Sequence, residues 1–275
     1  MFQQALKSTL PILQSMTKNL RGTPKATKES LERLKASLPP SFEKTPPTAG
    51  KIIQPAQASP PVASGQDDGR LERLEELKKQ ILSCTLCPHL VKSRTQVVYG
   101  VGNPFAELLF VGEAPGEEED LKGEPFIGKA GQLLTKIIGA MEYTREDIFI
   151  ANVLKCRPDM PEGESGNRKP KPAEMATCLP WLTKQIDLIK PKVIVALGLT
   201  AVEGLLGEPR TMRDVRGQWL DYHGVPLMPT YHPAYLLRNQ TLAEKRKVWE
   251  DMLLVLEKLG RPISAKQRGY FLEKA

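Results

Sequence analysis

The sequence has no long apolar segment and few aromatic residues. None of its apolar runs approaches the roughly 18 residues that a membrane-spanning helix needs, and Phe, Trp and Tyr make up only 6% of the 275 residues. All apolar residues together still reach 40%, with 26% charged, a balance typical of globular domains. The composition excludes a transmembrane protein and favours one α/β domain with an appendage. We see no secretory apolar core and expect a cytoplasmic protein.

Residues 1–69 lack what a folded domain needs. Phe2 and Phe42 are their only aromatic residues, and they hold nine of the 24 prolines. Lys and Arg exceed Asp and Glu by four in this segment, out of a net charge of +7 for the whole chain. Such a segment buries too little apolar surface to offset its ordering entropy. We predict a disordered basic, Pro-rich arm that contacts DNA, contacts a protein partner or is an inert spacer, followed by a domain over 70–260 and a C-terminal tail over 261–275.

Apolar runs alternate with helical patterns after residue 70. The expected strands are Glu107 to Val111, Asp147 to Ala151, Lys192 to Leu197 and Pro226 to Thr230. The expected helices cover 70–83, 128–141, 172–189, 200–206 and 243–259. This alternation predicts a mostly parallel four-stranded sheet with helices on both faces, that is, a three-layer αβα sandwich.

Cysteines are scarce but their spacing is informative. The chain has four, Cys84, Cys87, Cys156 and Cys178, with gaps of two, 68 and 21 residues. Disulfides are rare without a secretory signal, whereas four thiolates can converge on one centre. The spacing predicts a metal or cluster site and does not separate zinc from a [4Fe-4S] cluster, since both accept four thiolates. The alternative is a set of unrelated buried thiols.

Three polar residues directly follow apolar strands. They are Glu113, Asn152 and His232. Because ligands of open α/β sheets bind beyond the carboxyl ends of the strands, we expect a carboxylate, a carboxamide and an imidazole at one edge of the sheet. Each residue alone could be a turn cap, a backbone partner or a core histidine. Together they predict a ligand site.

Five short motifs carry a family resemblance. They are GEAPGE at 112–117, PFIGKAG at 125–131, NVLKCRP at 152–158, Asn167-Arg168, and HPAYLLRN at 232–239. In this order, within residues 78–258, they resemble the family 4 uracil-DNA glycosylases. The resemblance implies the fold of those enzymes and a [4Fe-4S] cluster on the four cysteines. It also implies an enzyme, expected as a monomer, that flips uracil out of single- or double-stranded DNA and hydrolyses its N-glycosidic bond.

The resemblance also implies roles around the uracil. Phe126 resembles the ring that stacks on the base, and Asn152 resembles the amide that pairs with uracil O4 and N3–H. His232 resembles the donor to O2 of the leaving base. Glu113 would orient water or stabilise the sugar cation, and Glu119 could share this work.

Two positions depart from the best-known uracil-DNA glycosylases. Ala114 lies where they carry a catalytic Asp, as is also the case in family 4, and Gly116 lies where they carry a Tyr that blocks the methyl group of thymine. Gly112 and Ala114 complete the implied uracil-binding set.

The implied DNA contacts lie on two segments. The set is Asn167, Arg168, Lys169, Leu236, Leu237 and Arg238. Leu236 and Leu237 would fill the gap left by the flipped base, and Arg238 would meet a phosphate. Lys155, Arg157 and Lys171 add to the basic residues around the loop between Cys156 and Cys178. Asn167 also resembles a residue with a catalytic-site role.

Two other classes of protein fit parts of this pattern. A non-catalytic four-cysteine protein could bind DNA through its basic loop, with the acid, amide and imidazole degenerate. A redox protein could use the cluster for electron transfer. His89 and His223 are interpreted as structural.

Overall fold

The computed structural model describes residues 68–161, 163–164 and 166–272. The predicted arm therefore lies outside the described residues, apart from its last two positions. Among the described helices, none combines the length and apolar character needed to cross a membrane.

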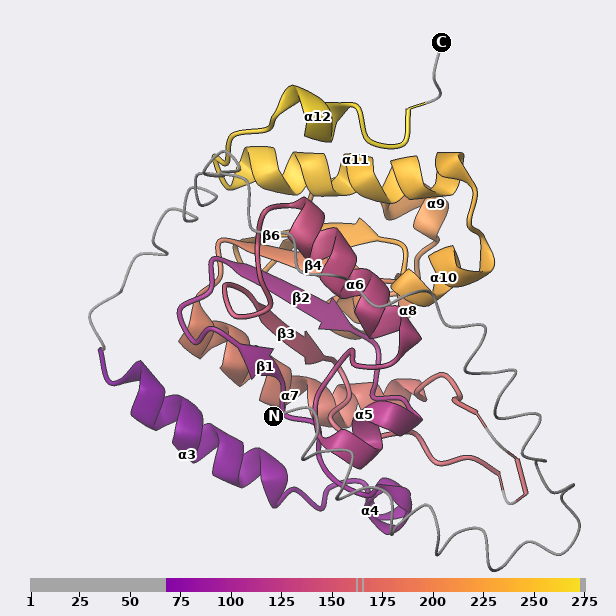
Figure 1. Cartoon of the computed structure of the whole chain (residues 1–275). Coiled ribbons are helices and arrows are strands. Elements are labelled where there is room, and N and C mark those ends of the chain that lie inside the picture. Colours follow the sequence, from indigo (N-terminus) through magenta and orange to yellow (C-terminus); the bar gives the residue numbers. More distant parts are fainter. Residues whose placement is uncertain (1–67, 162, 165, 273–275) are drawn as a thin grey trace, which may run out of the picture. The chain divides into compact units, whose positions relative to one another are not determined.

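A six-stranded sheet forms the centre of the described domain, in the order β1-β3-β2-β4-β6-β5 (Figure 1). Its four inner strands run parallel and are β2 (Leu108–Gly112), β3 (Phe149–Asn152), β4 (Val193–Leu197) and β6 (Val225–Thr230). They match the predicted strands. The predicted count of four is corrected to six, because β1 (Val101–Gly102) and β5 (Leu220–Tyr222) add antiparallel edges. Edge strands of two and three residues are too short to leave a readable periodicity.

Helices cover both faces of the sheet, which confirms the αβα sandwich. On one face lie α7 (Pro172–Ile189) and α8 (Leu199–Leu206), with α3 (Arg70–Leu82) packed on α7; on the other lie α6 (Lys129–Ala140) and α11 (Leu242–Lys258). Successive residues of β2 serve the two cores in turn. Leu109 and Val111 pack in the first, whereas Leu108 and Phe110 pack in the second, as the period of two in a strand requires.

Five shorter helices lie outside these layers, four in connections and one after α11. They are α4 (Pro88–Ser93), α5 (Glu117–Lys122), α9 (Met212–Val215), α10 (Pro233–Arg238) and α12 (Ala265–Arg268). The last lies in the segment expected as a tail, but this segment is packed on α11. Trp249 Nε1 donates a hydrogen bond of 2.6 Å to Gln267 O, and the Trp249 and Tyr270 rings lie 5.2 Å apart.

The register of the sheet brings the strand ends together. Gly112, the last residue of β2, pairs with Asn152, the last residue of β3. Leu197 at the end of β4 pairs with Thr230 at the end of β6. The residues that follow these strands therefore emerge at the same edge, and this edge carries the candidate site.

Candidate active site

A pocket of about 370 Å³ opens at this edge, within the size range of small-molecule sites. We call it the strand-end pocket. Its lining includes Glu113, Ala114, Glu119, Phe126, Asn152, Asn167, Arg168, His232 and Arg238. The structure thus brings together residues from five separate sequence motifs. Among the remaining predicted residues, Gly112 lies directly beneath the pocket, whereas Lys169, Leu236 and Leu237 are not part of its lining.

Asn152 forms the polar floor of the pocket. Its side chain is 3% exposed, and its Oδ1 has no hydrogen-bond partner among the described residues. A buried acceptor without a partner costs about 1–3 kcal/mol, so such atoms are rare outside functional sites. Gly112 permits this arrangement: a Cβ there would overlap Asn152 Oδ1 and lie 2.6 Å from Phe126 Cε2.

Phe126 forms the flat wall of the pocket in a strained conformation. Its φ of 54° is unusual for a bulky residue, and its ring lies 5.6 Å from that of His232 at an angle of 32°. Arg145 Nη1 donates a hydrogen bond of 3.1 Å to Phe126 O. The loop is therefore fixed from outside the pocket by a residue that the sequence pattern did not indicate.

Glu119 fixes the same loop from the other side. Its carboxylate accepts backbone hydrogen bonds from Gly116 (3.1 Å), Ile127 (3.0 Å) and Gly128 (3.1 Å). Three donors occupy most of its acceptor capacity. This geometry fits a role in positioning the Phe126 loop better than the shared catalytic work expected from sequence.

His232 is held as a neutral imidazole with a defined tautomer. It caps α10, and its Nδ1 accepts a hydrogen bond of 3.1 Å from Ala234 N. Burial, together with the charge of Arg238 and against the opposing charge of Glu119, lowers the pKa of His232 to about 4. At neutral pH the proton therefore resides on Nε2, which is left as a donor.

Glu113 is a partly buried carboxyl group at the end of β2. Burial raises its pKa above the ordinary value, while the hydroxyl of Thr200 and the charge of Lys169 lower it and Glu203 raises it. Thr200 lies in the first turn of α8, directly after β4. Sequence reasoning missed Thr200, although the same rule of polar residues after strand ends applies to it.

The predicted wedge residues are placed differently from each other. Leu236 is 4% exposed, because α10 packs against α6, so it is not available to enter DNA. Leu237 is 36% exposed. Arg238 lines the pocket, is exposed and has no salt bridge to another described residue. Only Leu237 and Arg238 of this motif have the accessibility that a contact with DNA requires.

The basic loop is less available than its composition suggests. Lys155 is 1% exposed, and its Nζ donates a hydrogen bond of 2.5 Å to Gln185 Oε1, so it cannot meet a phosphate. Burial lowers the pKa of Lys155 to about 8. Lys169 forms an ion pair of 2.8 Å with Glu203. Arg168 is engaged with two acidic residues, Asp159 and Glu174.

The four cysteines line one cavity, with apolar residues between them. We call them the four-cysteine centre. Arg94 Nη1 donates a hydrogen bond of 3.0 Å to Cys156 Sγ, and Lys155 N donates one of 3.3 Å to Cys178 Sγ. Burial raises the pKa of Cys178 to about 11. A bound cation would offset this cost and stabilise the thiolates.

Trp181 lines the same cavity and gives a further indication of its occupant. Its buried Nε1 has no hydrogen-bond partner among the described residues. Cysteine thiolates accept hydrogen bonds when they bind either zinc or a cluster, so this donor fits both. The residues of the centre therefore fit a metal ion or a cluster.

Comparison with known proteins agrees with this geometry. The profile described as "Uracil DNA glycosylase superfamily" matches residues 99–253. The Type-4 uracil-DNA glycosylase of Thermotoga maritima is 45% identical, with 66% of this chain and 93% of that protein covered. The Type-4 enzyme of Archaeoglobus fulgidus is 42% identical over 64% of this chain and 88% of that protein. The Type-5 uracil-DNA glycosylase of Pyrobaculum aerophilum is 26% identical, with 62% of this chain and 89% of that protein covered. The match spans the strands, the pocket and its flanking helices, and the chain therefore belongs to the uracil DNA glycosylase superfamily.

Proposed function

We propose that this protein is a monofunctional uracil-DNA glycosylase that releases free uracil from DNA and leaves an abasic site for base excision repair. The observation that carries the proposal is the unpaired Oδ1 of Asn152 in a pocket shared with Phe126 and His232. A base buried inside a duplex cannot reach such a site, so the nucleotide must be flipped out of the stack. Hydrolysis of the N-glycosidic bond needs no electron transfer, so the proposed reaction makes no use of the redox chemistry that the alternative assigns to a cluster.

Asn152 supplies a pattern that selects uracil. Its Oδ1 would accept a hydrogen bond from uracil N3–H, and its Nδ2 would donate one to O4. Cytosine presents an acceptor at N3 and a donor at N4, so an Asn152 amide held in this orientation would leave both of its groups unpaired. At about 1–3 kcal/mol for each unsatisfied buried group, this mismatch would disfavour cytosine by about 2–6 kcal/mol, or about 30- to 10⁴-fold. Phe126 would stack on the ring and fix its plane.

His232 and Glu113 fit the two charges that develop as the bond breaks. Cleavage leaves negative charge on uracil O2 and positive charge on the sugar. The Nε2–H of neutral His232 would donate to O2 without needing to protonate it, a contribution worth about 3 kcal/mol. Glu113, in its ionised form, would stabilise the sugar cation and orient the attacking water.

We propose that the four-cysteine centre holds a [4Fe-4S] cluster. Cys84, Cys87, Cys156 and Cys178 would be its ligands, and Arg94 would stabilise the Cys156 thiolate. When bound, the cluster supplies a covalent tie between the α3–α4 segment, the loop after β3 and α7. Iron and sulfide analysis with a visible absorption spectrum distinguishes it from zinc.

Contact with DNA is proposed for the exposed part of the α10 motif. Arg238 would meet a phosphate beside the flipped nucleotide, and Leu237 would fill the gap in the stack. We also propose that the protein acts as a monomer.

A base-release assay tests the proposal. The substrates are oligonucleotides, single- and double-stranded, that carry one uracil, and matched oligonucleotides carry cytosine or thymine at the same position. We expect free uracil from the first set and no free base from the second. DNA binding without release of uracil would instead support the non-catalytic four-cysteine protein.

A further inference from the structure

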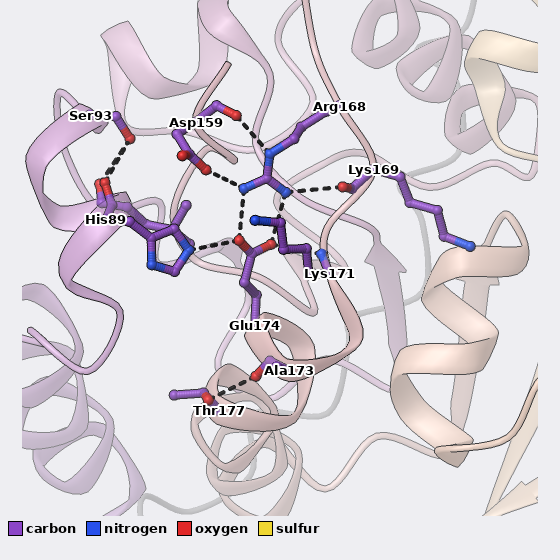
Figure 2. A network of polar contacts seen from close by, with 10 residues as sticks. His89, Ser93, Asp159, Arg168, Lys169, Lys171, Ala173, Glu174 and Thr177 are labelled. Carbon is purple, nitrogen blue, oxygen red and sulfur yellow. Dashed lines mark hydrogen bonds and ion pairs between the residues drawn. The ribbon is translucent and has the colours of Figure 1, made fainter. Parts of the chain in front are cut away.

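Arg168 lies at the centre of a polar network (Figure 2). It also lines the strand-end pocket. Its Nη1 and Nη2 bind the two carboxylate oxygens of Glu174 at 2.9 and 2.7 Å, as a fork. Its Nε donates a hydrogen bond of 2.6 Å to Asp159 O, and Nη2 also pairs with the Asp159 carboxylate. Nη1 donates a second hydrogen bond, of 3.1 Å, to Lys169 O. These contacts use all five N–H groups of the guanidinium, and none is left for a phosphate.

Glu174 is equally saturated. It is 3% exposed, and besides the fork it accepts hydrogen bonds of 2.7 Å from Lys171 N and from His89 Nε2. Burial alone would raise the pKa of Glu174, but these hydrogen bonds and the charge of Arg168 lower it to about 2. The group is therefore a carboxylate with four donors around it. Removing Arg168 or Glu174 would leave the buried polar groups of the other residue unpaired.

The network joins the cysteine-bearing segments to the pocket wall. His89 follows Cys87 by two residues, Asp159 follows Cys156 by three, and Glu174 precedes Cys178 by one turn of α7. Asp159 and Glu174 bind Arg168 directly, and His89 is joined to it through Glu174. Arg168 lines the strand-end pocket together with its neighbour Asn167.

The same cluster is not a second metal site. The ligand atoms of His89, Asp159 and Glu174 lie within 4.8 Å of one another, close enough for a cation. The guanidinium of Arg168 already supplies positive charge to both carboxylates. The planar guanidinium of Arg168 also fixes the orientation of the Glu174 carboxylate, which a metal ion acting as a point charge would not do.

We propose that Glu174 is a positioning residue that holds Arg168, and with it Asn167, in the pocket wall, so that the rigidity of the four-cysteine centre extends to the uracil site. This inference rests on the proposed function for its kinetic readout. It replaces the sequence-based role of Arg168 as a phosphate contact. It predicts that the geometry of the Arg168–Glu174 fork, and not the charge of Arg168, supports catalysis.

Conservative variants of the full-length protein separate geometry from charge. Arg168→Lys keeps the charge and loses the fork, and Glu174→Gln keeps the shape and loses the ionised partner. Because misplacing a reacting group by about 1 Å costs about 100-fold, we expect each variant to lower kcat by about 10- to 100-fold while KM changes less than about threefold. The double variant should be no slower than the worse single variant, since the two residues act as a unit. Glu164→Gln, an exposed acid in the same loop, is the matched control and should leave kcat unchanged.

Two measurements besides activity complete the test. The salt dependence of DNA binding should keep its slope in Arg168→Gln, whereas a phosphate contact would flatten it by about one unit. Amide hydrogen exchange of residues 166–169 should accelerate in Glu174→Gln and not in Glu164→Gln. If Glu174→Gln fails to fold, Arg168→Lys alone decides the kinetic question.

The possible results are distinct. Wild-type kcat in Arg168→Lys, additive losses in the double variant, or a flattened salt slope in Arg168→Gln would overturn the positioning role. A wild-type protein that releases no uracil would instead refute the proposed function, and hydrogen exchange would still report whether Glu174 holds the loop.

Discussion

Gly112→Ala tests the close approach of the β2 backbone to the Asn152 and Phe126 side chains of the strand-end pocket. Gly112 lies in β2 under Asn152 and Phe126, and a Cβ there would lie 2.6 Å from Phe126 Cε2. This is about 0.8 Å inside ordinary contact. Because β2 is a central strand paired on both sides, the ring must move and the strand cannot. A shift of nearly 1 Å at the stacking wall should lower kcat/KM by about 30- to 100-fold, equivalent to about 2–3 kcal/mol.

The same substitution has a stability cost that can be separated from the effect on activity. Overpacking a buried site costs about 1–3 kcal/mol, which thermal or urea unfolding measures. Gly139→Ala is the matched control, since a Cβ at this exposed position of α6 meets nothing within 4 Å. It should raise the unfolding free energy by about 0.5–1 kcal/mol, as Ala replaces Gly in a helix, and leave kcat/KM unchanged. Normal uracil release by a folded Gly112→Ala protein would refute the proposed packing of base, Phe126 and Asn152.

Three further predictions follow from neighbouring contacts. Activity should fall as pH drops through the raised pKa of Glu113, which must be ionised. Thr200→Val removes a hydrogen bond that lowers this pKa, so the fall should move to higher pH in a pH–rate profile; an unmoved profile would contradict this assignment. Glu119→Gln should lower kcat and cost about 1–3 kcal/mol of unfolding free energy, because two of its backbone partners hold the Phe126 loop; unchanged values for both would argue against a positioning role. Cys156→Ala should reduce the iron content and lower the melting temperature, because it removes a cluster ligand. Full iron loading in this variant would exclude Cys156 as a ligand.

The central fold was predictable because its elements have strong local patterns. The four parallel strands are short apolar runs, and α7 begins and ends at the predicted residues, Pro172 and Ile189. The edge strands were not predictable, because two or three residues carry no periodicity. Helix α12 likewise depends on contacts with Trp249, which lies 18 residues from its hydrogen-bond partner Gln267.

The part of the candidate site that lies at the strand ends was predictable from the topology of parallel sheets. Parallel strands end at one edge, so Glu113, Asn152 and His232 were expected together, and they line one pocket. The basic loop was misjudged for a different reason. The partners of Lys155 and Arg168 are Gln185, 30 residues away, and Glu174 on α7. Only the folded chain reveals that such charges are buried or paired.

Rates of uracil release in point variants test the central claim most directly. The comparison is single-turnover release by the wild-type protein, Asn152→Ala and His232→Ala, with His223→Ala as the control because His223 is exposed and lies outside the pocket lining. We expect a loss of about 100-fold or more for each of the first two variants, since His232→Ala removes the donor to O2 and Asn152→Ala removes both hydrogen bonds to the other edge of the base. We expect less than about a twofold change for the control. Wild-type rates in both pocket variants would contradict the account.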